Sequence, residues 1–129
     1  MTYWTQLLWV AIGGAAGAMM RFTVIKAVVG HWGDKPLPWG TLAVNFLGSF
    51  AFGLCFILLS QKFNMNEVFR LTVLVGFLGS FTTFSTFSFE VLRLIESHQL
   101  LWALSYILSS VTLCVMGLWV ASMLTEKLV

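Results

Sequence analysis

Long apolar segments alternate with short polar connectors along this chain. A helix that spans a bilayer needs about 20 predominantly apolar residues. Four segments meet that requirement, and they predict membrane-spanning helices over residues 7–29, 39–59, 71–94 and 100–124. The connectors between these segments are too short to form a soluble domain. We therefore predict an all-α membrane protein in which residues 1–129 form a single transmembrane domain.

Composition agrees with this class of protein and excludes others. The chain is 59% hydrophobic and only 9% charged, whereas soluble domains have about 25% charged residues. The net charge of +2, without a basic cluster, gives no indication of nucleic-acid binding. Cys55 and Cys114 lie in apolar runs, where free cysteines behave as small hydrophobic residues. His31 and His98 lie in connectors. The sequence shows no nucleophile–base pair of the kind that would indicate an enzyme.

The distribution of basic residues does not predict a single orientation in the membrane. An excess of lysine and arginine on one side normally marks the cytoplasmic side. Here each side has three, namely Lys62, Arg70 and Lys127 against Lys26, Lys35 and Arg93. Either a weak bias still sets one orientation, or the chain inserts both ways and pairs as an antiparallel dimer. The charge count leaves both alternatives open.

The third apolar segment contains an unusual mixture of hydroxyl groups and phenyl rings, GFLGSFTTFSTFSFE, at residues 76–90. Glycine loosens a helix, and serine and threonine can satisfy the backbone groups that a break sets free. The segment is therefore either a helix broken near residues 79–83 or a continuous helix whose hydroxyls bond to carbonyls one turn earlier. Phe84 and Phe87 share one helix face, and the positive edges of their rings can solvate a small anion.

Polar residues in the other segments also allow two interpretations each. Asn45 shares a helix face with Thr41, so its amide either bonds to a neighbouring helix or points into a polar pathway. Arg21 lies near the end of the first segment, where it either extends to the interface or attracts anions. Tyr106 and Ser110 are four residues apart, which suits either a helix contact or an ion pathway.

Two further features concern packing and charge at the helix surfaces. Gly13 and Gly17 are four residues apart, and small residues on one face let helices approach closely. Glu90 either pairs with Arg93 three residues later or guards a vestibule.

Three stretches of the sequence resemble the Fluc/CrcB family of small bacterial fluoride channels: GGAAGAMMRF, GTLAVNFLGSFAFG and GFLGSFTTFSTFSFE. The resemblance covers essentially the whole chain, and the third stretch is its most specific part. It implies a fluoride-selective channel that releases fluoride from the cytoplasm down its electrochemical gradient and so gives fluoride resistance. It also implies a multi-pass protein of the bacterial cytoplasmic (inner) membrane.

The resemblance further implies the assembly. Members of the family are antiparallel dual-topology homodimers in membrane lipid, with a third helix that is broken near its middle. Two pores run side by side, each lined by both subunits. A structural sodium ion at the dimer interface would be held by the backbone carbonyls of Gly79 and Thr82.

The resemblance also implies which residues contact the ion. Arg21 would lie in the vestibule, and the fluoride pathway would be formed by Asn45, Phe84, Phe87, Thr41, Ser85, Tyr106, Ser110 and Thr112. Fluoride is small and strongly hydrated, so such a pathway must replace water with protein donors at each step. The larger chloride ion would fit a narrow, ring-lined path badly.

Two other functions compete with this interpretation. Small multidrug-type transporters are also four-helix dimers, but they use a carboxylate inside the first span. The first span here has Arg21 and no aspartate or glutamate. A scaffold subunit would use its polar residues only to join helices and would pass no ions. The residues themselves do not separate a passive channel from a coupled exporter; the family resemblance favours the channel.

Overall fold

The computed structural model describes residues 1–128 except residues 33–35 and 62–65. Lys35 and Lys62, two of the charges counted above, lie outside the described residues. Every regular element in the described ranges is a helix. Four helical stretches are long and apolar enough to cross a membrane, which confirms the predicted all-α, four-span fold.

The helices run somewhat beyond the predicted apolar segments. The first, second and fourth spans are α1 (Tyr3–Trp32), α2 (Trp39–Gln61) and α6 (Leu100–Leu128). The third consists of α3 (Glu67–Phe69), the π-helix η1 (Arg70–Leu78), α4 (Gly79–Phe81) and α5 (Phe84–Glu96). A helix of 30 residues such as α1 is about 45 Å long, so its polar ends extend past a hydrocarbon core of about 30 Å. His31 therefore belongs to α1 and not to a connector.

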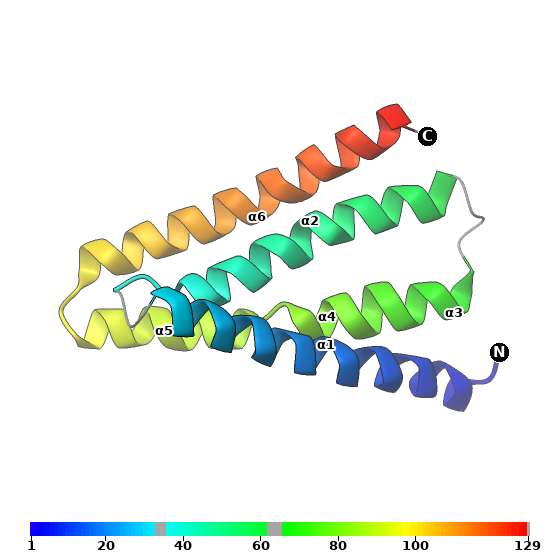
Figure 1. Ribbon diagram of the computed structural model, residues 1–129, viewed down its shortest axis with the longest axis horizontal. Coiled ribbons are helices and arrows are strands. Elements are labelled where there is room, and N and C mark those ends of the chain that lie inside the picture. Colours follow the sequence, from blue (N-terminus) through cyan, green and yellow to red (C-terminus); the bar gives the residue numbers. More distant parts are fainter. Residues whose placement is uncertain (33–35, 62–65, 129) are drawn as a thin grey trace.

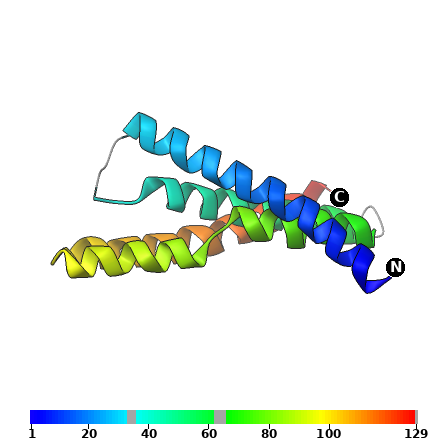
Figure 2. The ribbon, with the colours of Figure 1, turned by 90° about the horizontal axis from the view of Figure 1, so that it is seen from below.

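The four spans form a bundle with α2 near its centre (Figure 1). Helix α2 packs mainly against α6 and also against α1, while α1 packs along η1 and α4. Helix α6 also packs against α5. Figure 2 shows that the carboxyl end of α1 diverges from α5. The amino-terminal half of the third span is therefore covered by α1, and its carboxyl-terminal half is covered by α6.

The third span is broken between α4 and α5, as the hydroxyl-rich stretch allowed. Thr82 and Thr83 both have extended backbone angles, with ψ of 156° and 118°. The new helix begins at Thr83, whose Oγ1 accepts a hydrogen bond from the Thr86 amide at 3.2 Å. This N-cap satisfies one of the amide groups that a helix start leaves without a partner.

Gly13 and Gly17 bring α1 into direct contact with the backbone of η1. Both glycines are buried, and a Cβ added to either would collide with a carbonyl group of η1, that of Thr72 or of Phe77. The prediction that this glycine pair packs against another helix is thus confirmed. The close approach fixes α1 against the amino-terminal half of the third span.

We expect Gly13→Ala to destabilise the protein strongly, because its methyl group would overlap the Thr72 carbonyl. Overpacking of this kind typically costs about 1–3 kcal/mol, and a backbone obstacle cannot rotate away. The measurement is the melting temperature of purified protein in detergent. Gly30→Ala is the matched control in the same helix, because no atom of the described residues lies within 4 Å of a Cβ placed there. Equal melting temperatures for the two variants would show that α1 and η1 are not in close contact.

Candidate functional site

Asn45 of α2 holds the break of the third span in place. Its Nδ2 donates to the Thr83 carbonyl at 3.0 Å, and its Oδ1 accepts from the Thr83 amide at 2.7 Å. One side-chain amide thus satisfies both backbone groups of the residue at the break. Nδ2 has a second N–H. Asn45 therefore makes the interhelical contact, while that second N–H remains a donor beside the break.

A hollow of about 350 Å³ lies beside this break, between α2, α5 and α6. We call it the polar pocket. Its lining combines amide, hydroxyl, thiol and phenyl groups, from Asn45, Ser49, Thr82, Thr83, Phe84, Phe87, Ser110, Val111, Cys114 and Val115. The structure thus brings together four of the predicted pathway residues, one from α2, two from α5 and one from α6.

Ser110 is the residue of this pocket whose polar group is least satisfied. Only 6% of its surface is exposed, and its Oγ has no hydrogen-bond partner among the described residues. Burying a hydroxyl without a partner is unfavourable, so such a group calls for an explanation. A ligand in the polar pocket that accepts its proton would supply one.

The rings of Phe84, Phe87 and Tyr106 form a continuous aromatic contact next to this hydroxyl. The centroids of Phe84 and Phe87 are 5.4 Å apart, and those of Phe87 and Tyr106 are 5.1 Å apart. The ring planes are tilted by 45° and 55°, so the rings are not stacked face to face. Phe87 is buried, whereas 77% of the Phe84 surface is exposed in the single chain.

Glu90 lies one turn beyond Phe87 and accepts hydrogen bonds from two hydroxyl groups. Thr41 Oγ1 donates to Glu90 Oε1 and Tyr106 Oη donates to Oε2, each at 2.8 Å. Thr41 and Tyr106 are fully buried, and in this structure both hydroxyls donate to the carboxylate. The anticipated partner, Arg93, lies over the ring of Phe89 instead. Sequence reasoning missed this arrangement because it depends on helix packing, although Thr41 had been recognised as facing a polar path.

Two smaller hollows lie in the same bundle, and one of them shares lining residues with the polar pocket. The glutamate pocket, about 210 Å³, is lined by Thr41 and Glu90 together with residues of α1 and the start of α2. The glycine pocket, about 270 Å³, is lined in part by Gly79 and shares Ser49 and Thr82 with the polar pocket. The glycine pocket therefore adjoins the polar pocket, whereas the glutamate pocket shares no lining residue with it.

The other predicted residues lie either at the break or away from the polar pocket. Arg21 Nη1 donates a long hydrogen bond of 3.5 Å to the Thr82 carbonyl, which places its guanidinium at the break. Ser85 is exposed, with its Oγ 3.3 Å from Thr83 Oγ1. Thr112 is exposed on α6 and does not line the polar pocket. Residues on a helix are 100° apart, so Thr112 is turned about 200° away from Ser110.

Cys114 lines the polar pocket although it was interpreted as an apolar packing residue. Its spacing from Tyr106 and Ser110, eight and four residues, places the three on one face of α6. That spacing was a signal available in the sequence. Free cysteine in an apolar run behaves as a small hydrophobic residue, so residue type alone does not indicate a polar position for Cys114.

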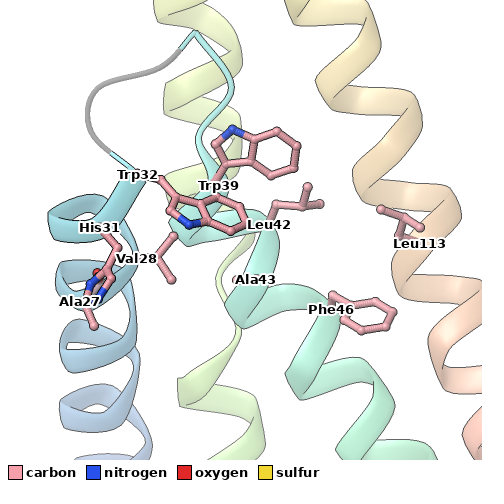
Figure 3. Close-up of a pocket in the computed structure, with 9 residues that line it drawn as sticks. All are labelled: Ala27, Val28, His31, Trp32, Trp39, Leu42, Ala43, Phe46 and Leu113. Atoms are coloured by element: carbon pink, nitrogen blue, oxygen red, sulfur yellow. The ribbon is translucent and has the colours of Figure 1, made fainter.

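A larger groove lies elsewhere on the bundle and lacks such chemistry (Figure 3). It measures about 570 Å³ and lies between α1, α2 and α6, where Trp32, Leu42, Phe46 and Leu113 dominate its lining. An ion that enters a membrane protein needs polar partners to replace its water. The polar pocket, not this apolar groove, is therefore the candidate functional site.

The sequence is similar to a known protein family over nearly its whole length. Residues 8–122 match the family described as CrcB-like protein, Camphor Resistance (CrcB). Relatives named fluoride-specific ion channel FluC include that of Magnetococcus marinus, 51% identical over 87% of this chain and 90% of the relative. Those of Hahella chejuensis and Geobacter sulfurreducens are 46% and 40% identical, covering 94% and 96% of this chain and 94% and 99% of the relatives. The chain therefore belongs to the CrcB-like family, as its three characteristic stretches suggested.

Proposed function

We propose that this chain is a fluoride-specific ion channel, the function that its relatives' names state. The observation that best supports a pathway at this position is the buried Ser110 hydroxyl, which lacks a partner and lines the polar pocket. Fluoride leaving the cytoplasm down its electrochemical gradient would give the cell resistance to fluoride. A channel of this kind makes and breaks no covalent bond, so the protein is not an enzyme.

The lining of the polar pocket suits fluoride better than a cation. Ser110 offers an O–H and Asn45 keeps a second N–H, and both are donors. Phe84 and Phe87 offer ring edges, which have a partial positive charge. Together these groups can take the place of the water molecules that donate hydrogen bonds to a hydrated fluoride ion. Each contact is weak, and several of them act together. Conduction requires such binding, which admits an ion and also releases it.

The hydroxyls around Glu90 define the end of this path. The protons of Thr41 and Tyr106 point at the carboxylate in the described structure. When an anion arrives, either hydroxyl can rotate toward it, because a hydroxyl hydrogen has no fixed position. We infer that these groups and Ser110 act in series, separated by the rings of Phe87 and Tyr106. Ser85 and Thr112 remain predicted members of the track, as does Arg21 of the vestibule.

A multidrug-type exporter is the alternative function, and the site does not favour it. Such a transporter needs a carboxylate in the first span to bind a cationic substrate. Helix α1 has no aspartate or glutamate; instead it has Arg21, whose guanidinium lies at the break. Selective fluoride flux with no effect of lipophilic cations would separate the two functions.

We also propose that the channel is an antiparallel, dual-topology homodimer in the cytoplasmic (inner) membrane of a bacterium. The exposed Phe84 ring beside the half-open polar pocket supports this assembly, since a second chain would bury the ring and close the pocket. The balanced basic residues support insertion in both orientations. Molecular mass in detergent tests the dimer, and membrane-impermeant labelling of chains from both sides tests the topology. A monomer that conducts would contradict the assembly.

The break also has groups that suit a structural sodium ion at such an interface. In a continuous helix the Gly79 carbonyl would bond to the Thr83 amide, but that amide donates to Asn45 instead. Gly79 is exposed, and the Thr82 carbonyl has a second lone pair besides the one facing Arg21. Oxygen ligands of this kind fit a hard cation. Sodium bound there would supply positive charge at the dimer centre, and replacing it with a large organic cation should reduce fluoride flux.

Fluoride efflux from proteoliposomes is the direct test of the proposed function. Vesicles are loaded with potassium fluoride, and valinomycin starts the efflux, which a fluoride electrode records. We expect rapid, voltage-driven release, and little release of chloride from matched vesicles. Chloride release close to that of fluoride would contradict the proposed selectivity, and no fluoride release from folded protein would contradict the function.

Ser110→Ala should reduce fluoride efflux about tenfold, because it removes a buried donor worth about 1–2 kcal/mol to an ion in the pocket. The substitution deletes one atom and leaves no unsatisfied hydroxyl, so folding should not suffer. Ser105→Ala, on an exposed face of the same helix, is the matched control. The two variants are compared in the proteoliposome assay. If fluoride efflux through Ser110→Ala equals that through Ser105→Ala, the Ser110 hydroxyl does not contact fluoride.

A further inference from the structure

Cys114 is a nucleophilic side chain that the proposed pathway leaves unused. It lies on α6 one turn beyond Ser110, and both residues line the polar pocket. Residues four apart on a helix are neighbours, with Cβ atoms about 5–6 Å apart. The thiol is therefore adjacent to the Ser110 hydroxyl, which is buried and has no hydrogen-bond partner among the described residues. A buried hydroxyl without a partner indicates that a ligand binds in the space next to it, and Cys114 borders the same space.

We propose that Cys114 is a modification site inside the pathway, at which small thiol-reactive compounds close the channel. This inference rests on the proposed function, because it requires that ions pass through the polar pocket. The pocket measures about 350 Å³, so a methylthio or benzylthio group attached to the sulfur occupies part of the space an ion needs. The added group is apolar and presents no donor. It both narrows the path and removes the polar surroundings that replace water.

The chemistry requires water as well as space. In the reaction with an alkyl methanethiosulfonate, the thiol loses its proton to solvent and the thiolate attacks the sulfenyl sulfur. A new S–S bond forms, the S–SO2 bond breaks, and methanesulfinate leaves with the bonding electron pair. The thiolate is the reactive form. A thiol that water can reach from the mouth of the polar pocket can ionise, whereas one packed among apolar side chains reacts slowly.

Cys55 provides the comparison within the same chain. It is the other free cysteine and is also partly buried. It lies near the carboxyl end of α2, beside a hollow of about 460 Å³ whose other lining residues are Leu58, Leu59, Asn66 and Phe69. The described part of the chain places no predicted pathway residue in that lining. Modification of Cys55 should therefore leave ion flux unchanged.

The test measures fluoride efflux before and after treatment with methyl or benzyl methanethiosulfonate. It compares the full-length wild type with Cys55→Ser, Cys114→Ser and Cys114→Ala in proteoliposomes. Each treated rate is divided by the untreated rate of the same variant, and mass spectrometry records which cysteine is labelled. We expect efflux to fall at least about tenfold in wild type and Cys55→Ser, because an apolar constriction blocks an ion path. Both Cys114 variants should keep their untreated rates, and dithiothreitol should restore the others.

The outcomes separate this inference from the proposed function. No fluoride efflux from untreated wild type would contradict the function, whatever the labelling. Normal efflux with Cys114 labelled and no block would show that Cys114 lies outside the ion path. If Cys55 were labelled and Cys114 were not, the Cys114 thiol would not be accessible to water. A block that persists in both Cys114 variants would assign the effect to another group. Each of the last three results overturns the inference while leaving the channel function in place.

Discussion

Fluoride efflux through the Asn45→Asp variant is expected to fall about 100-fold or more, equivalent to about 2.7 kcal/mol. Two effects combine. The substitution replaces the N–H that faces the Thr83 carbonyl at 3.0 Å with an oxygen, so two acceptors meet. It also places a negative charge on the wall of the polar pocket, where it repels an anion in surroundings that screen charge poorly. Proteoliposome efflux measures the result.

Asn66→Asp is the matched control for this variant. Asn66 is exposed and caps α3, where its Oδ1 accepts from the Val68 amide at 2.9 Å. An aspartate keeps that acceptor, and its charge suits the start of a helix. Both variants should elute at the size of the wild-type assembly, so that a loss of flux is not a loss of fold. Wild-type efflux through a correctly assembled Asn45→Asp protein would show that the ion path does not pass Asn45.

The sequence predicted the spans because apolar length is a local property, whereas the break was one of two interpretations of the third segment and only the family resemblance implied it. Apolar length alone identifies a spanning helix, and the run of glycines and hydroxyls around residues 79–83 indicates where one can open. The two interpretations of Asn45 could not be separated at that level. The structure confirms the interhelical bonds, since the amide holds the Thr83 backbone, while a pathway role for its remaining N–H stays a prediction.

The details of the site depended on helix rotation, which composition does not specify. Glu90 was compared with Arg93, its neighbour in sequence, although its partners are Thr41 of α2 and Tyr106 of α6. On α6, hydroxyl chemistry suggested Thr112, whereas the period of 3.6 residues per turn places Cys114 in the polar pocket. Helical spacing, more than residue type, decides which α6 residues line this pocket, and the place of Thr112 in the pathway stays a prediction.

Phe84→Ile should lower fluoride efflux about 10- to 100-fold while the assembly remains intact. The Phe84 ring begins α5 at the break, lines the polar pocket and lies 5.4 Å from Phe87. Isoleucine is also apolar, so the contact expected with a second chain in the proposed dimer would largely be kept. It has no quadrupole, so the positive ring edge that faces an anion is lost. The measurement is efflux, together with the size of the purified assembly.

Phe89→Ile on the same helix is the control that gives this variant its meaning. Phe89 is also largely exposed, at 59%, and its ring lies under the Arg93 guanidinium, away from the polar pocket. The two substitutions change the same atoms on one helix, so any general effect on α5 or on membrane insertion is common to both. A defect confined to Phe84→Ile would therefore come from the ring's position beside the ion path. Equal efflux through the two variants would mean that the exposed ring serves only to join two chains, and the pathway would then have to be placed on the Ser110 and Tyr106 side of the pocket alone.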